Sequence, residues 1–342
     1  MDYRHSGVDI DAGNAAVRRI KELARSTFTP GVLSEIGSFG GLFHLDAARY
    51  RDPVLVASAD GVGTKLKVAF MSGRHDTVGT DLVNHCVNDI LVQGARPLFF
   101  LDYLATGMLL PEVAAKIVAG IARGCRENGC ALLGGETAEM PGFYDQGEYD
   151  LAGFIVGIVE RDRVIDGKSI RPGDQLVGIP SSGLHTNGYS LARRIVFNRL
   201  NLAVGSFVPE LGAAIGDALL AAHRSYLPLI GPLLDEGHLL GLAHITGGGI
   251  TDNLPRILPP GTAARIDRAA WTVPPIFTFL RKAGEVPIED MYRTFNMGIG
   301  LIAACRAEHA KELLARLSAA GEPDARVIGE IVAGKPGVIY AG

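Results

Sequence analysis

The chain carries Val54-Leu55-Val56-Ala57-Ser58-Ala59-Asp60-Gly61-Val62-Gly63-Thr64-Lys65, an apolar run that ends in a glycine loop with two charges. A short apolar run rich in Val predicts a buried β-strand. Glycines let main-chain N–H groups approach a bound anion, Asp60 offers a hard oxygen to Mg²⁺, and Lys65 offers a charge to a phosphate. The segment therefore predicts a strand, a ligand-binding loop and a helix. A strand-to-helix turn with an incidental lysine is the alternative.

The following segment, residues 76–93, predicts a helix with one polar stripe. Asp81, Asn84, His85, Asn88 and Asp89 are spaced by three and four residues, so they share one face. Apolar residues occupy most of the other faces, which predicts burial, and buried carboxylates and amides need partners. Metal ions are the natural partners of such a stripe, so we predict Asp81 and Asp89 as metal ligands. The alternative is that the stripe faces solvent.

The rest of the first half alternates strands and helices. Helices are predicted over residues 11–28 and 111–128, and strands over 98–104, 130–133 and 151–159. The strand over 130–133 runs into Gly134-Gly135-Glu136-Thr137, and loops at strand ends commonly carry ligand-binding residues in α/β domains. We predict Glu136 as a metal- or phosphate-site residue, although the segment is also typical of an ordinary turn.

A polar, turn-rich stretch over residues 166–174 separates this half from a second one, in which the alternation restarts. We predict domains over residues 1–168 and 169–342, since a chain of this length usually forms two domains. In the second half, strands are predicted over residues 175–179, 242–245, 297–304 and 327–332. Helices are predicted over 189–197, 215–234 and 308–319, the second of them interrupted near Pro228.

Two loops of the second half are candidate phosphate sites. The loop Ser181–Gly188 combines hydroxyls, glycines and His185, which we predict as a proton donor or phosphate ligand. Gly247, Gly248 and Gly249 precede a predicted helix, so their N–H groups are predicted to contact phosphate. Tight turns without a ligand are the alternative, and His244, within a predicted strand, is expected to be a core histidine.

Composition excludes several classes of protein. The 342 residues are 47% hydrophobic and 20% charged, as in ordinary globular proteins, and the net charge of −4 argues against nucleic acid as the main partner. No apolar run approaches the roughly 18 residues of a membrane span, and the N-terminus lacks a signal-peptide pattern, so we expect a cytoplasmic protein without a membrane partner. The four cysteines form no CxxC pair and are expected to be buried thiols.

Seven motifs in order carry a family resemblance over nearly the whole chain. They are Gly7–Asn14, Asp60–Lys65, Leu101–Gly107, Gly134–Gly142, Ser181–Leu191, His244–Gly249 with Asn253–Arg256, and Glu289–Gly298. Together they resemble the phosphoribosylformylglycinamidine cyclo-ligase, or aminoimidazole ribonucleotide synthetase, family. The Asp60 loop and the Asn88-Asp89 helix are shared with a wider ATP-using superfamily that includes thiamine monophosphate kinase.

The resemblance implies a two-domain α/β (α+β) fold with mixed sheets and helices. The first domain is expected to bind ATP and Mg²⁺ and to form a barrel with its twin across a homodimer, and the second is expected to complete the substrate and phosphate site. The implied enzyme is an ATP-dependent cyclo-ligase of de novo purine biosynthesis. It phosphorylates the formyl amide oxygen of formylglycinamidine ribonucleotide, after which the amidine nitrogen closes the ring to 5-aminoimidazole ribonucleotide, giving ADP and phosphate.

The implied site gathers the residues predicted above. The metal ligands are Asp60, Asp81, Asp89 and Glu136, the catalytic residues are His185 and Lys65, and the ATP and phosphate contacts are Gly61, Gly63, Thr64, Lys65, Asn88, Thr137, Gly247, Gly248 and Gly249.

Ala222-His223-Arg224-Ser225-Tyr226 departs from the family, which usually reads Pro-Thr-Arg-Ile-Tyr, so only Arg224 and Tyr226 are retained. A small-molecule kinase of the same superfamily is the alternative enzyme, and a silent binding subunit is the alternative from another class.

Overall fold

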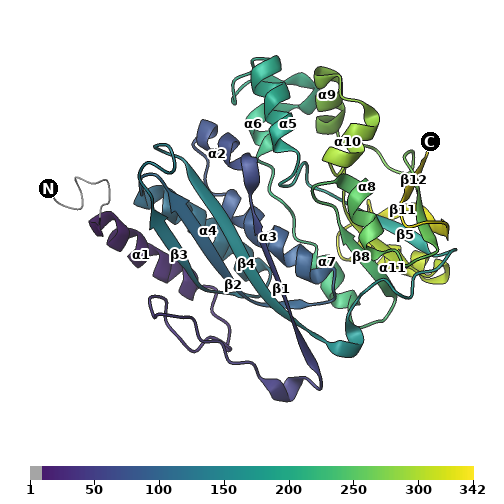
Figure 1. The fold of residues 1–342 in the computed structure, drawn as a ribbon, viewed down its shortest axis with the longest axis horizontal. Helices are drawn as coiled ribbons and strands as arrows, with labels where there is room; N and C mark the ends of the chain where they lie inside the picture. Colours follow the sequence, from purple (N-terminus) through teal and green to yellow (C-terminus); the bar gives the residue numbers. More distant parts are fainter. Residues whose placement is uncertain (1–9) are drawn as a thin grey trace. The chain divides into compact units, whose positions relative to one another are not determined.

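A computed structural model describes residues 10–342 and divides them into two units. The first unit consists of the described residues up to Ile90 together with Arg96–Arg161. The second consists of Leu91–Ala95 and Asp162–Gly342. Figure 1 follows the chain through both units from purple to yellow. Gly7, Val8 and Asp9 of the first motif lie outside the described residues.

The first unit alternates strands and helices, as predicted from the sequence. Its elements are α1 (Ile10–Arg25), β1 (Pro53–Gly61), α2 (Leu66–Ser72), α3 (Val78–Leu91), β2 (Arg96–Thr106), α4 (Pro111–Glu127), β3 (Ala131–Glu139) and β4 (Tyr149–Glu160). Helix α2 was not predicted separately.

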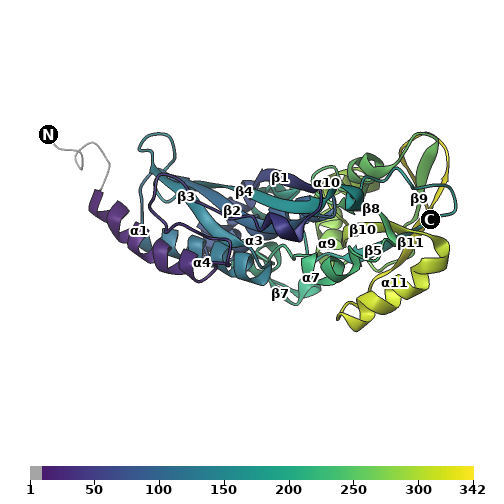
Figure 2. The same ribbon diagram turned by 90° about the horizontal axis from the view of Figure 1, so that it is seen from below.

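The strands of the first unit form a four-stranded mixed sheet in the order β1-β4-β2-β3. Strands β2 and β3 are parallel, and β4 runs antiparallel to both β1 and β2. Figure 2 shows α1, α3 and α4 on one side of this sheet. On the opposite side, Leu55 and Phe154 remain 62% and 45% exposed. We call this side the open face.

Helices α3 and α4 approach each other closely because glycines line their crossing. A Cβ atom added to Gly79 would lie 2.2 Å from the carbonyl oxygen of Ile117, and one added to Gly120 would lie 2.8 Å from that of Asp76. The Thr80 hydroxyl also donates to the Gly120 carbonyl oxygen at 2.9 Å. The crossing fixes α3, which carries the polar stripe, against the sheet.

The second unit contains a six-stranded sheet in the order β12-β9-β11-β5-β10-β8 and a two-stranded sheet, β6-β7. The strands are β5 (Gln175–Pro180), β6 (Phe207–Val208), β7 (Ala213–Ala214), β8 (Leu239–His244), β9 (Thr262–Asp267), β10 (Ile299–Cys305), β11 (Arg326–Ala333) and β12 (Val338–Ala341). The α-helices are α5 (Tyr189–Arg193), α6 (Ile215–Leu219), α7 (Leu227–Ile230), α8 (Gly249–Asn253), α9 (Pro275–Gly284), α10 (Ile288–Thr294) and α11 (Ala307–Ala319).

The central strands β5 and β10 pack with α7 and α11 into the core of the second unit. Its buried members include Val177, Ile179, Ile230, Leu301 and Leu317. The order of strands and helices confirms an α/β fold with mixed sheets.

The helix predicted over residues 215–234, with an interruption near Pro228, is two short helices, α6 and α7. The interruption lies just before Pro228, over residues 220–226. Pro228 and Pro232 lack the N–H donors that a continuous helix needs. Arg224 Nη1 and Tyr226 Oη, from the segment between the two helices, both donate to the carbonyl oxygen of Pro180 and so anchor this segment to the end of β5. Elements β9, α9, α10 and β12 had not been predicted.

Candidate functional site

The end of β1 and one face of α3 bring two carboxylates and an imidazole together in the first unit. His85 Nε2 lies 2.8 Å from Asp60 Oδ2 and 3.9 Å from Asp89 Oδ2. The Gly61 N–H donates to Asp60 Oδ1, and the Ser58 hydroxyl donates to Asp89 Oδ2. The carboxylates of Asp60 and Asp89 remain 38% and 26% exposed, so this acidic cluster keeps oxygen atoms accessible to a cation.

Electrostatics favour a charged imidazole within the acidic cluster. Burial by itself lowers the pKa of His85, but the hydrogen bond to Asp60 and the charges of Asp89 and Asp60 outweigh it, so the pKa is raised. The two carboxylates therefore stabilise the protonated form of His85 relative to the neutral form.

Lys65 and Asp81 form a buried ion pair behind the glycine loop. The two charged groups lie 2.9 Å apart and neither side chain is exposed. Burial lowers the pKa of Lys65, and the charge of Asp81 opposes this shift. Lys65, the predicted phosphate contact, is therefore paired in this structure with Asp81, a predicted metal ligand. By contrast, Gly63 and Thr64 of the same loop are exposed.

The polar stripe of α3 is not a solvent face. Asp81, Asn84, His85 and Asn88 are at most 5% exposed. Asn128 Nδ2 of α4's C-terminal cap donates to Asn84 Oδ1 at 2.8 Å. The alternative in which the stripe faces water is therefore wrong.

Within one chain, Glu136 and Asp60 lie on opposite faces of the sheet. Strand register aligns Asp60 with Gly153, and Gly153 with Asp102, so all three positions face the helix-covered side of the sheet, where a Cβ at Gly153 would meet Leu82 of α3. Glu136 aligns with Tyr103, one residue further along, and successive side chains of a strand alternate between faces. The exposed Glu136 is therefore on the open face, and one chain does not bring it together with Asp60 and Asp89.

A cavity of about 630 Å³ adjoins β2 and β3. The Gly37–Gly41 loop, Asp102, Glu136 and Thr137 are among its lining residues. Burial raises the pKa of Asp102 to about 7. The predicted ATP contact Thr137 and the predicted metal ligand Glu136 thus share one cavity.

In the second unit, the loop Ser181–Gly188 is fixed by a motif that is distant in sequence. Asn296 Nδ2 donates to the Gly183 carbonyl oxygen, and the Ser181 hydroxyl donates to Asn296 Oδ1. His185 adopts φ of +61° and is fully buried, and the Ser182 N–H donates to its Nε2 at 3.2 Å. Asn296 belongs to the Glu289–Gly298 motif, but no sequence pattern predicted that it supports this loop.

The retained residues of the departing segment support the same loop. Arg224 Nη1 pairs with Glu322 and also donates to the Pro180 carbonyl oxygen, immediately before the loop. The Ser182 hydroxyl donates to the Ala222 carbonyl oxygen at 2.5 Å. Arg224 thus anchors the end of β5, and the departing positions Ala222, His223 and Ser225 flank it.

The second predicted phosphate loop is closed by Asn253. Its Nδ2 donates to the carbonyl oxygens of Gly247 and Gly249, at 3.0 and 2.8 Å. The Gly249 N–H donates to the Thr246 carbonyl oxygen at 3.0 Å and is therefore used within the turn. His244 is buried, as expected, and bonds to His223.

Two family profiles cover most of the chain. Residues 45–159 match the AIR synthase related protein, N-terminal domain, and residues 171–341 match the C-terminal domain of the same family. No helix within residues 10–342 has both the length and the apolar character required to span a membrane.

Curated relatives match at full length. A phosphoribosylformylglycinamidine cyclo-ligase of Trichlorobacter lovleyi is 59% identical over 96% of this chain and 94% of its own length. One from Desulfitobacterium hafniense is 55% identical over 99% and 98%.

Solved structures share the fold at low identity. Thiamine-monophosphate kinase from Stenotrophomonas maltophilia aligns with a TM-score of 0.69 and 19% identity, over 96% of both chains. The hydrogenase maturation protein HypE in complex with ATP aligns with a TM-score of 0.62 and 20% identity, over 93% of this chain and 88% of that one. With its two AIR synthase-related domains and its full-length similarity to curated enzymes, the chain belongs to the phosphoribosylformylglycinamidine cyclo-ligase family.

Proposed function

We propose that this protein is an ATP-dependent cyclo-ligase of the cytoplasm that converts formylglycinamidine ribonucleotide to 5-aminoimidazole ribonucleotide in purine biosynthesis. The observation that carries the proposal is full-length similarity, at 59% identity, to a curated enzyme of that name. The acidic cluster of Asp60, His85 and Asp89 supports it, because nucleotide phosphates are normally bound with a divalent cation.

The proposed reaction balances in two steps. The formyl amide oxygen attacks the γ-phosphorus of ATP, and ADP leaves. The amidine nitrogen then attacks the former carbonyl carbon, the C–O bond breaks, and inorganic phosphate carries the oxygen away. Phosphorylation converts a poor leaving oxygen into a good one, so the protein has to supply positioning and charge neutralisation.

The donor set of the acidic cluster suits Mg²⁺, which prefers carboxylate oxygens. Asp60 and Asp89 would hold the ion, and their partial exposure supports this role. Mg²⁺ bound there would neutralise phosphate charge. Exposed Gly63 and Thr64 would contact phosphate oxygens. Lys65 and Asp81 remain candidates for the same site, and each would have to exchange its buried partner for the ligand.

We propose that the second unit contributes phosphate contacts through its two loops. The N–H groups of Gly247 and Gly248 are the candidates there, since that of Gly249 is used within the turn. His185, held by the Ser182 N–H and the Asn296-supported loop, would donate a hydrogen bond or a proton to the reacting oxygen.

We also propose a homodimer through the open face of the first unit. Leu101 aligns with Phe154, and Tyr103 with Ala152, so partly exposed apolar side chains of β2 and β4 adjoin the exposed Phe154. Contiguous apolar patches of this kind mark association surfaces. Glu136 lies on the same face and would then be near the interface, which would reconcile its predicted role with its distance from Asp60.

One assay separates this function from the alternatives. With formylglycinamidine ribonucleotide, ATP and Mg²⁺, the cyclo-ligase forms one imidazole ring and one inorganic phosphate for each ADP. A kinase relative would leave the phosphoryl group on its product, and a silent subunit would form no ADP. ADP formation without ring formation would therefore contradict the proposal.

A further inference from the structure

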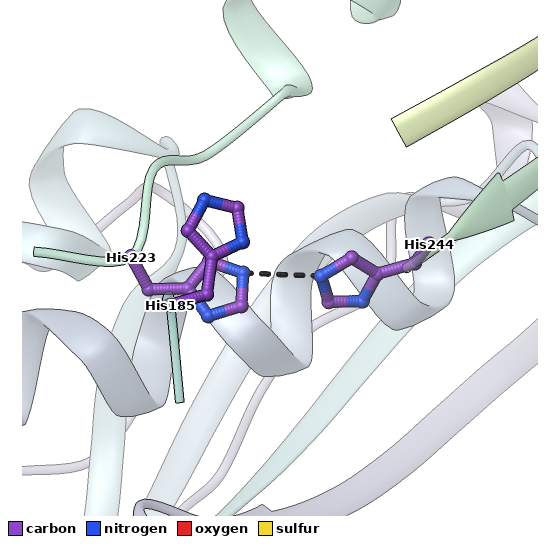
Figure 3. Close-up of side chains that lie close together, drawn as sticks. All are labelled: His185, His223 and His244. Atoms are coloured by element: carbon purple, nitrogen blue, oxygen red, sulfur yellow. Dashed lines mark hydrogen bonds between the residues drawn. The ribbon is translucent and has the colours of Figure 1, made fainter. Parts of the chain in front are cut away.

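Three imidazoles from separate segments of the second unit converge (Figure 3). His185 comes from the loop Ser181–Gly188, His223 from the segment before α7, and His244 from the end of β8. Their exposed fractions are 0%, 0% and 6%. One ring nitrogen of each lies within 4.8 Å of the others. We call these residues the histidine cluster.

The contacts of His223 orient its ring toward His244. The two Nε2 atoms lie 3.0 Å apart, and His223 Nδ1 lies 3.2 Å from the Thr186 hydroxyl oxygen. When Nδ1–H donates to Thr186, the lone pair of His223 is on Nε2 and faces His244. A hydroxyl that holds the second ring nitrogen is the arrangement that supports histidine as a metal ligand.

We propose that the histidine cluster binds a divalent transition metal ion, for which Zn²⁺ is the representative. Neutral imidazole nitrogens suit Zn²⁺, and three histidines with one water are a common zinc ligand set. Nitrogen atoms that bind tetrahedral zinc are about 3.4 Å apart. His223 and His244 therefore need to separate by only a few tenths of an ångström, and the ion replaces the proton that they share.

His185 has to move further than the other two. Its ring stacks on that of His223, with centroids 4.0 Å apart and planes inclined by 18°. Lone pairs lie in the ring planes, so two stacked rings cannot point at one ion. His185 must rotate about its side-chain bonds and give up the hydrogen bond from the Ser182 N–H. Coordinate bonds to a tightly held zinc ion outweigh one neutral hydrogen bond.

His223 is the central member of the histidine cluster, because its ring stacks on that of His185 and bonds to that of His244. His223→Thr and His223→Gln each remove its ring nitrogens and keep a polar side chain at this position. A second group, His238, His309 and Glu312, is partly exposed and provides a matched control.

Metal binding has a consequence that rests on the proposed function. An ion that holds His185 prevents this side chain from donating to the reacting oxygen, so Zn²⁺ should inhibit turnover even with excess Mg²⁺. Inhibition is a secondary readout, because the binding measurement does not require the enzyme to be a cyclo-ligase.

The test uses the metal-free full-length protein and three variants: His223→Thr, His223→Gln and His309→Gln. Co²⁺ is added first, its visible absorption is recorded, and Zn²⁺ is then titrated by calorimetry. We expect the strong absorption of tetrahedral Co²⁺ with one ion per chain, displaced by Zn²⁺. Both His223 variants should weaken Zn²⁺ binding by at least about tenfold, and His309→Gln should not change it.

Three results would overturn the proposal. These are a parent protein without tetrahedral Co²⁺ absorption, a His223 variant with unchanged Zn²⁺ affinity, and a loss of binding in His309→Gln. Melting temperatures of all variants are measured alongside to confirm that they fold. If one His223 variant folds poorly, the other still tests whether His223 is a ligand. If the metal binds but the parent lacks cyclo-ligase activity, only the proposed function fails.

Discussion

The ammonium nitrogen of Lys65 lies 2.9 Å from the carboxylate of Asp81, and both side chains are fully buried. The pair ties the loop after β1 to the first turn of α3. A buried pair of this kind contributes little net stability compared with apolar residues, but removing one partner leaves an uncompensated charge.

Asp81→Asn should lower the free energy of unfolding by about 3–5 kcal/mol, because the ammonium of Lys65 then stays buried without its counter-charge. Denaturant unfolding measures this loss. The double variant Lys65→Met with Asp81→Leu should recover most of the stability but not the turnover, if Lys65 contacts ATP. Parent-like turnover in a stable double variant would remove both residues from the nucleotide site.

Asp89→Asn should raise the Mg²⁺ concentration for half-maximal turnover by about 10–100-fold. The change removes one carboxylate charge, while the amide oxygen still accepts the hydrogen bond from Ser58. Turnover is measured against free Mg²⁺ at saturating ATP. Asp76→Asn, at an exposed position, serves as the control. An unchanged Mg²⁺ dependence in Asp89→Asn would exclude this side chain as a ligand.

Gly247→Ala should weaken binding of a phosphate-bearing ligand by about tenfold while the melting temperature is retained. Its added Cβ would lie 3.3 Å from Asn187 Oδ1, a contact that a small shift relieves, and a methyl group would partly block an anion. Gly248→Val is a poorer probe, because Gly248 has φ of +96° and a Cβ there would lie 2.7 Å from that of Asp252.

Affinities for ATP and for the ribonucleotide are measured separately, with Gly205→Ala as the control since its added Cβ meets no atom within 4 Å. Unchanged affinity for both ligands in a stable Gly247→Ala protein would mean that the loop is only a turn.

Asp102→Asn should stabilise the protein above neutral pH. Burial raises the folded-state pKa of Asp102 to about 7, compared with about 4 in an unfolded chain. Between these values the folded state holds the extra proton, so stability of the parent falls as pH rises through this window.

At pH 8 the asparagine variant should be more stable than the parent by about 2–4 kcal/mol, and near pH 4 the two should be similar. Thermal unfolding at both pH values measures the difference, with the exposed Asp145→Asn as the control. Equal stability of Asp102→Asn and the parent at pH 8 would contradict a buried, proton-holding carboxyl group.

Phe154→Glu should convert the proposed homodimer to a monomer, because it introduces a charge at the centre of the open face. Light scattering at working concentration measures the molar mass. Phe207→Glu, at a 66% exposed position of the second unit, should leave the mass unchanged. A parent protein that is already monomeric would refute the dimer.

The sequence by itself determined those features that depend on neighbouring residues. The spacing of three and four residues put Asp81, His85 and Asp89 on one face of α3, because the helix period sets that arrangement without help from other elements. The glycines after β1 indicated a loop for the same reason, because the conformational freedom of glycine depends on the residue itself and not on distant contacts.

Tertiary structure decided which charges meet. Pairing of Lys65 with Asp81, and of Asp60 with His85, depends on how α3 packs on β1. Glu136 seemed equivalent to Asp60 as a strand-end carboxylate, yet strand register turns it to the other face. His185, His223 and His244 became neighbours only because three segments distant in sequence converge. Contacts between elements follow from packing and register, which spacing along one element does not encode.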